Sequence, residues 1–241
     1  GIRDVAPSRG LGMCIRDSDE ITNQQLYIAC KRVVEKISNS ISDIEETFEG
    51  TKEFKSRKIC EVFRDKTVSY TDPHGDGQGV SQSHGAISEH LKVNLPDEDW
   101  FVFTDNFGTS EEKEFVAYFK EHVQDLKNKY EKVYLIRNER QLKLFSFNGG
   151  ERFEPDYVLI MTKQNGNITD QYQIFIEPKG SHLIQKDSWK ESFLLEIESS
   201  GIPVKTLVDD NNYKIIGFPF FNRAERLSQF NEAMTNLLVA E

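Results

Sequence analysis

The chain has 241 residues, which is enough for one large domain or for a core with an appendage. Hydrophobic residues make up 37% and charged residues 29%, as in soluble globular proteins, and no apolar run reaches the ~20 residues that a membrane-spanning helix needs. The net charge of −10 gives no support for strong nucleic-acid binding by the whole chain, although Lys and Arg slightly outnumber Asp and Glu over residues 120–190.

The N-terminal part of the chain carries weak structural signals. Residues 1–18 show no hydrophobic period, and we expect a disordered tail or a segment that is not native to the protein. Apolar residues then recur at helical spacing, which predicts an amphipathic helix over about 20–47 with a break near 38–40. The next segments predict a strand or mixed element over 59–70, a turn-rich loop over 72–79 and a short strand over 100–103.

The signals are stronger from residue 109 onward. Thr109 precedes Ser110-Glu111-Glu112, a helix-capping pattern, and apolar residues recur at helical spacing from there to Tyr130. We then expect strands over 133–136, 141–147, 157–161 and 172–176, a helix over 187–199, strands over 204–208 and 213–218, and a helix over 223–239. This alternation of helices and strands predicts an α/β domain.

Two short polar motifs flank the predicted strands over 157–161 and 172–176. Pro155-Asp156 precedes the first strand, and Glu177-Pro178-Lys179 follows the second. Residues two apart in a strand point to the same face, so Glu177 and Lys179 should project together. Asn165-Gly166 is a hairpin turn signal between the strands, and a hairpin would bring Asp156 alongside them.

Two carboxylates and an ammonium on such a platform suit a hard cation and a phosphate. Asp156 and Glu177 are the candidate ligands for Mg²⁺, with the Pro178 carbonyl as a third. Lys179 would orient or deprotonate the attacking water, or contact the phosphate, and a general-base role requires a lowered pKa. The alternative is that Asp156 is a turn residue and that Glu177 and Lys179 form a surface pair.

The chain resembles a known family over residues 100–221. The resemblance is to the endonuclease region at the C-terminal end of the restriction (Res) subunit of type III restriction-modification enzymes, within the PD-(D/E)xK nuclease superfamily. It rests on ordered motifs at 108–113, 134–139, 153–157, 176–180, 189–191 and 216–222. It implies a catalytic set of Asp156, Glu177 and Lys179 that cuts DNA with Mg²⁺.

The resemblance also implies an architecture and partners. We expect a restriction-endonuclease-like core over 100–241, a mixed central sheet flanked by helices, with an N-terminal helical and irregular extension over 19–99. The implied partners are double-stranded DNA, a modification methyltransferase subunit and a helicase/ATPase part of the same enzyme, with no membrane. The chain has no phosphate-binding loop of its own, since Gly75–Gly79 lacks the lysine, so it would be a C-terminal fragment.

The three cysteines lack zinc-site spacing and form no close pairs. An odd number of unpaired thiols is typical of a reducing compartment, so we expect a cytoplasmic location.

Several superfamily members add an acid from the first core helix. Glu112 is the candidate and Glu111 the competitor, and the alternative for both is charge that complements the helix dipole.

Four basic side chains are candidates for DNA contact, namely Lys186, Lys190, Arg137 and His182. The alternatives are a charged solvent face for the lysines, pairing with Glu139 or a neighbour for Arg137, and a solvated His182. A rival for the whole chain is a catalytically silent docking module of the same fold that binds a partner subunit.

Overall fold

The computed structural model describes residues 22–42, 48–50, 52–55, 57–68, 79–84, 87–199, 204–205 and 211–239. The expected tail over 1–18, nearly all of the expected loop over 72–79 and the end of the expected strand over 204–208 lie outside these residues. The chain divides into two compact units, Gly1–Thr47 and Phe48–Glu241. No helix among the described residues is long and apolar enough to cross a membrane.

The described part of the first unit is a single helix. Helix α2 spans Asn23–Ser42 without interruption, so the expected break near 38–40 is wrong. The helix starts where Thr22 and Gln25 cap each other: Gln25 N–H donates to Thr22 Oγ1 at 3.3 Å, and Thr22 N–H donates to Gln25 Oε1 at 3.0 Å.

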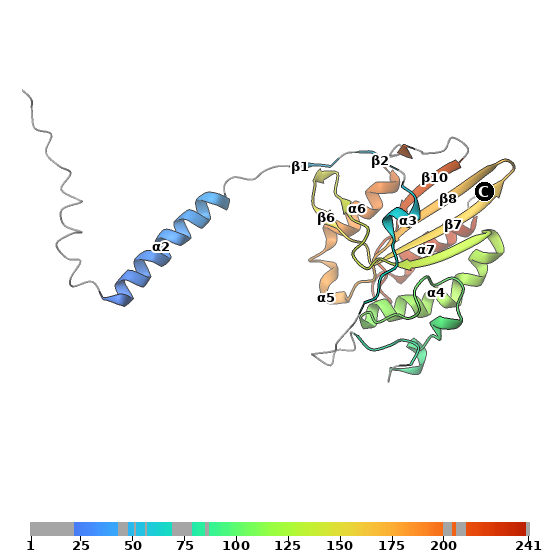
Figure 1. The fold of residues 1–241 in the computed structure, drawn as a ribbon, viewed down its shortest axis with the longest axis horizontal. Helices are drawn as coiled ribbons and strands as arrows, with labels where there is room; N and C mark the ends of the chain where they lie inside the picture. The colour runs from blue at the N-terminus through green and yellow to red at the C-terminus, as the bar shows by residue number, and fades with distance from the viewer. Residues whose placement is uncertain are drawn as a thin grey trace, which may run out of the picture. The chain divides into compact units, whose positions relative to one another are not determined.

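The second unit is built on a mixed four-stranded sheet (Figure 1). Strands β3 (Lys132–Arg137), β7 (Tyr157–Asn165), β8 (Ile168–Ile176) and β10 (Asn211–Gly217) lie in the order β10-β8-β7-β3. Strand β7 is antiparallel to β3 and β8, and β10 is parallel to β8. Strands β3, β8 and β10 therefore end at the edge of the sheet where β7 begins.

A tight hairpin joins β7 to β8. Asn165 pairs with Ile168, and Gly166 between them has a φ of +63°, which glycine adopts without a Cβ penalty. The pairing continues to Tyr157 and Ile176, so the two strands are longer than the apolar runs suggest. The expected turn at Asn165-Gly166 is confirmed.

Helices cover both faces of the sheet. Helix α4 (Ser110–Lys129) and helix α7 (Leu227–Val239) pack on one face, while the short α5 (Ser181–Ile184) and α6 (Ser188–Ser199) pack on the other. Alternate β7 residues divide between the two cores: Leu159 belongs to the core that contains Phe115 and Phe230, and Val158 belongs to the core that contains Phe193. The α/β architecture with a mixed central sheet is confirmed.

Several expected elements differ from the structure. The segment over 59–70 begins with helix α3 (Ile59–Val62) and contains no strand in its described part, and the strand over 100–103 is an isolated bridge from Phe101 to Leu135. The strand over 141–147 is reduced to β4 (Leu144–Phe145), which pairs with β6 (Arg152–Phe153). The sequence pattern did not predict the two-residue pairs of β1 (Phe48–Glu49) with β5 (Asn148–Gly149) and of β2 (Phe54–Lys55) with β9 (Val204–Lys205).

The terminal helix starts at Leu227 and not at 223. The Asn222 side-chain oxygen accepts hydrogen bonds from Ala224 N–H at 2.9 Å and from Glu225 N–H at 2.8 Å. This side-chain turn satisfies the backbone over 223–226 in place of a helix.

The contact between β10 and α6 predicts an intolerant glycine. A Cβ on Gly217 would lie 2.1 Å from the Leu194 carbonyl oxygen, which belongs to helix backbone that cannot move aside alone. Gly217→Ala should therefore lower the free energy of unfolding by roughly 1–3 kcal/mol or more in urea denaturation. In the control Gly166→Ala no atom lies within 4 Å of the new Cβ, and the positive φ should cost only about 1 kcal/mol. Equal losses in the two variants would contradict the described packing.

Candidate active site

Asp156 and Glu177 lie next to each other because of the hairpin register. Tyr157 pairs with Ile176, so the residues just outside this pair meet where β7 begins and β8 ends. We call this edge of the sheet the site edge. The Asp156 backbone N–H donates a hydrogen bond to Glu177 Oε2 at 3.1 Å. The structure thus brings together the two carboxylates that the hairpin was expected to join.

Lys179 is held at the same edge of the sheet by contacts of both its side chain and its backbone. Its Nζ lies 2.8 Å from Glu177 Oε1 and 2.8 Å from Asp187 Oδ2. Its backbone N–H donates to the Phe221 carbonyl at 2.9 Å, and its own carbonyl accepts from the Asn222 amide at 2.8 Å. Glu177 and Lys179 are therefore a buried pair in contact and not a surface pair.

The protonation of Lys179 follows from these contacts. Burial alone would lower the pKa of Lys179, but the charge of Glu177 and the hydrogen bond to Asp187 outweigh it and raise the pKa above its usual value. The ammonium is thus protonated at neutral pH. Among the three roles open to it, this arrangement favours contact with a phosphate or orientation of a water over proton abstraction.

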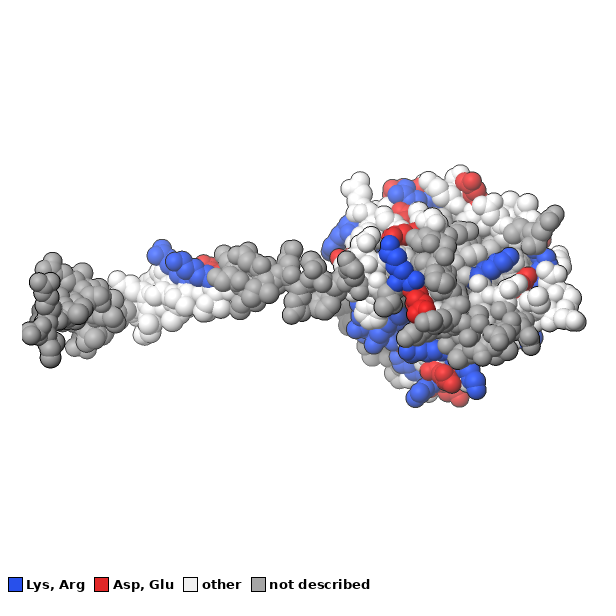
Figure 2. Space-filling model, turned by 90° about the horizontal axis from the view of Figure 1, so that it is seen from above, with Lys and Arg blue, Asp and Glu red and all other residues white. Residues whose placement is uncertain are grey.

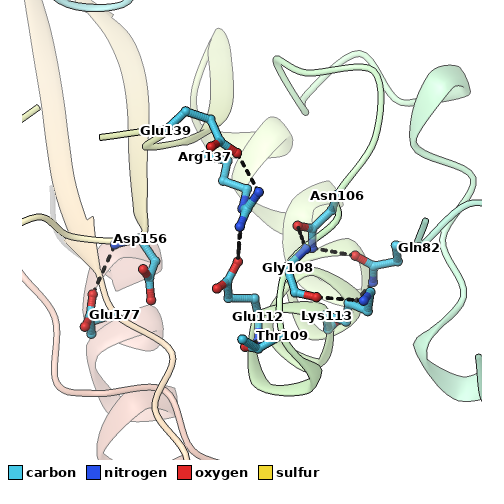
Figure 3. A network of polar contacts seen from close by, with 10 residues as sticks. All are labelled: Gln82, Asn106, Gly108, Thr109, Glu112, Lys113, Arg137, Glu139, Asp156 and Glu177. Atoms are coloured by element: carbon cyan, nitrogen blue, oxygen red, sulfur yellow. Dashed lines mark hydrogen bonds and ion pairs between the residues drawn. The ribbon is translucent and has the colours of Figure 1, made fainter. Parts of the chain in front are cut away.

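The ionised form of Asp156 is disfavoured in this structure. Burial raises the pKa of Asp156 well above its usual range, and the charges of Glu177 and Glu112 raise it further, against the opposing effect of Lys179 and Arg137. Its carboxylate oxygens accept no hydrogen bond from any described residue. Figure 3 shows this carboxylate between Glu177 on one side and Glu112 on the other. A cation placed there would relieve the repulsion among the three groups.

Glu112 reaches the site from the first turn of α4. Its carboxylate Oε2 lies 2.8 Å from Arg137 Nη2, and Arg137 Nη1 lies 2.5 Å from Glu139 Oε1 (Figure 3). The Thr109 hydroxyl caps the helix by accepting from Glu112 N–H at 3.4 Å. A Cβ on Gly108 would lie 2.1 Å from Glu112 Oε2, so a glycine is needed for the carboxylate to lie where it does.

Glu111 lies on a different side of the site. Its Oε1 would be 2.9 Å from a Cβ on Gly180, the residue that follows Lys179. Glu112 is instead buried and raises the pKa of Asp156. Glu112 therefore acts on Asp156 and is paired with Arg137, so its contacts are not limited to the helix dipole.

Sequence reasoning missed the residues that support this arrangement. The Gln82 oxygen accepts from the Asn106 amide at 2.8 Å, and the Asn106 oxygen accepts from Gly108 N–H at 3.1 Å (Figure 3). The Gln82 amide donates to the Lys113 carbonyl at 2.9 Å. Asp187, which binds Lys179, has a sequence signal only as the start of the predicted helix. These polar residues stand outside any hydrophobic period, so no sequence signal marked their contacts.

The four candidate DNA-binding residues differ in their surroundings. Lys190 Nζ lies 3.0 Å from Asp187 Oδ2, and Arg137 is in the ion pairs with Glu112 and Glu139, which favours the pairing alternative for Arg137. Lys186 and His182 are exposed, with Lys186 directly before Asp187 and the ring of His182 close to Gly180.

The donor set suits a partly hydrated magnesium ion. The described residues contain no group of three or more His, Cys, Asp or Glu side chains that could hold a metal ion, so a complete protein cage is absent from them. Mg²⁺ usually keeps several waters and binds through one or two carboxylates. Asp156, whose oxygens accept no hydrogen bond from the described residues, and Glu177 beside it fit that requirement.

Comparisons with known proteins show which family the chain belongs to. A family model described as "HI_1054_C: C-terminal domain" matches residues 47–239, and the chain belongs to this family. It is also 33% identical over 224 residues to a protein of Haemophilus influenzae named "Uncharacterized protein". The match covers 90% of this chain and 45% of that protein, so the chain spans less than half the length of this curated relative. No solved structure matches the chain.

The raised pKa of Asp156 predicts how stability depends on pH. An unfolded Asp has a pKa near 3.8, and the folded value is higher, so the stability present below pH about 4 is lost as pH rises toward the folded pKa. Asp156→Asn cannot ionise, so it removes this loss of stability. The variant keeps the backbone N–H at position 156 that donates to Glu177. We expect the variant to be more stable than the parent at neutral pH, because the asparagine has no charge to lose.

The measurement is thermal unfolding of the parent and the variant over a series of pH values from acid to neutral. The gain of Asp156→Asn should vanish at the acid end, where the parent Asp156 is protonated. A variant that is less stable than the parent at neutral pH would contradict the description of the carboxylate cluster.

Proposed function

We propose that the chain is a magnesium-dependent endodeoxyribonuclease module with a restriction-endonuclease-like core. The observation that carries the proposal is the Asp156 carboxylate, which lies between two other carboxylates with no donor from the described residues and has Lys179 nearby. Such a cluster costs stability in the free protein, and a bound divalent cation would offset that cost.

Asp156 and Glu177 would hold the ion, with the Pro178 carbonyl as a third protein ligand. The Glu177 carbonyl accepts from Phe221 N–H at 3.0 Å, whereas the Pro178 carbonyl accepts no hydrogen bond from the described residues. When bound, Mg²⁺ supplies a lowered pKa for a coordinated water and neutralises charge on the phosphate.

The other site residues have roles that follow from their protonation. Lys179, held as an ammonium, would donate to a phosphate oxygen or orient the attacking water. Glu112 would add a negative charge beside Asp156 and strengthen the attraction for the cation. Arg137 keeps Glu112 in place through their ion pair and limits the repulsion at the site edge.

The wider context of the proposal is a larger enzyme. The mixed sheet with helices on both faces is what a restriction-endonuclease-like core requires, and the motif resemblance is to the type III Res subunit. The chain spans 45% of the length of its relative, and the matching family is described as a C-terminal domain. We propose that a helicase/ATPase part and a methyltransferase subunit deliver duplex DNA to this site in the cytoplasm.

The proposal is tested by DNA cleavage. Asp156→Asn should reduce Mg²⁺-dependent nicking of plasmid DNA by at least about a hundredfold, because it removes a metal ligand without a change in size. We prefer it to Lys179→Ala, which would leave Glu177 and Asp187 without their shared ammonium.

Asp170→Asn is the matched control. Asp170 is a buried aspartate, at 5% exposed, and accepts a hydrogen bond from Asn212, but it lies toward the turn end of the hairpin and away from the site edge. It should cut as the parent does. Equal cleavage by the parent and Asp156→Asn would refute the site assignment. A parent that binds no metal and cuts no DNA would favour the docking module.

A further inference from the structure

Arg140 has an unusual backbone conformation close to the site edge. Its φ is 59°, and it is the single non-glycine residue with a positive φ in the part of the chain that the structure describes. The left-handed region is unfavourable for a residue with a Cβ, and such conformations persist where the surroundings enforce them. They are found preferentially at functional sites, so the cause of this one is informative.

The buried side chain of Asn138 enforces the turn over 138–142. Its oxygen accepts from Gln141 N–H at 3.0 Å and from Leu142 N–H at 2.8 Å. Its amide donates to the carbonyls of Leu142 and Pro155, each at 2.9 Å. The Asn138 backbone N–H donates to the Asp156 carbonyl at 2.7 Å. The turn that carries Arg140 is thus fastened directly to the backbone of the candidate metal ligand.

A second segment fixes the turn independently. Lys66 Nζ donates to the Glu139 carbonyl at 2.6 Å, and Arg64 N–H donates to Gln141 Oε1 at 2.9 Å. The residues on both sides of Arg140 are therefore held by hydrogen bonds from outside the turn. The backbone of Arg140 is therefore held in a fixed position relative to the backbone of Asp156.

The guanidinium of Arg140 differs from the neighbouring cations in having no carboxylate partner among the described residues. It is exposed and makes no hydrogen bond or ion pair with any described residue, whereas Arg137, Lys179 and Lys190 are each paired with carboxylates. On the face drawn in Figure 2, basic and acidic side chains of the second unit are interspersed. Duplex DNA that approaches the carboxylates of the site edge would be repelled, and an exposed guanidinium on the turn that is bonded to the Asp156 backbone would offset part of this repulsion.

We infer that Arg140 binds a backbone phosphate of duplex DNA beside the site edge, and that the Asn138 turn holds it there for this purpose. The inference rests on the proposed nuclease function and adds a binding residue to it. Arginine suits the role because its planar guanidinium donates two parallel hydrogen bonds to a phosphate.

The test compares three variants in binding to a fluorescent DNA duplex, with EDTA present to prevent cleavage, over a series of salt concentrations. Arg140→Asn removes the charge and tolerates the left-handed backbone. It should weaken binding roughly tenfold at low salt and reduce the slope of log Kd against log salt by about 1, the value for one phosphate contact. Its melting temperature should equal or exceed that of the parent, and Arg140→Lys should keep the slope.

Lys132→Asn is the control for net charge, since Lys132 is exposed and begins β3 at the opposite end of the sheet. It should leave the slope unchanged. The inference is overturned if Arg140→Asn binds as the parent does, or if Lys132→Asn weakens binding equally. A parent that cuts DNA while Arg140→Asn binds normally refutes this inference alone, whereas a parent that neither binds nor cuts duplex DNA refutes the proposed function as well.

Discussion

The register between β7 and β8 is the constraint on which the candidate site depends. The two strands pair from Asn165 and Ile168 at the turn to Tyr157 and Ile176 at the far end, and the next residues along each strand are Asp156 and Glu177. A shift of one residue would move every side chain of a strand to the other face of the sheet. The packing of Leu159 and Val158 in opposite cores resists such a shift, so the burial of apolar side chains also fixes the distance between the carboxylates.

The charges at the site edge compensate one another with one exception. Asp187 lies between Lys179 and Lys190, and Arg137 lies between Glu112 and Glu139. Buried ionic groups are stable only when they are paired and hydrogen-bonded, and these groups meet that condition. The Asp156 carboxylate has no such partner among the described residues, and its raised pKa is the consequence. The site therefore lacks one positive charge, at the position where a metal ion is proposed.

The parts of the fold that sequence predicts are those with local causes. The start of α4 follows from the Thr109 cap, and the hairpin follows from two apolar runs around Asn165-Gly166. From the hairpin alone the proximity of Asp156, Glu177 and Lys179 could be inferred. The long helix α2 has a local period too, but the expected break at 38–40 gave the weak helix propensity of Ser and Asn too much weight.

The remaining features depend on contacts between distant parts of the chain. Two-residue strands such as β1 and β5 are too short to show a period, and they exist only because their partners are brought close. The pairing of Lys179 with Asp187 and the buried contact of Gln82 with Asn106 leave no pattern along the sequence. The strained turn at Arg140 depends on the bond from Asn138 to Pro155, which only the folded chain reveals.

Calorimetric titration of Mg²⁺ tests the central claim most directly, because it requires neither DNA nor the rest of a larger enzyme. The account predicts a binding site in the parent that is lost in Asp156→Asn and retained in Asp170→Asn. Binding of equal strength in the parent and Asp156→Asn, or no binding in the parent, would contradict it.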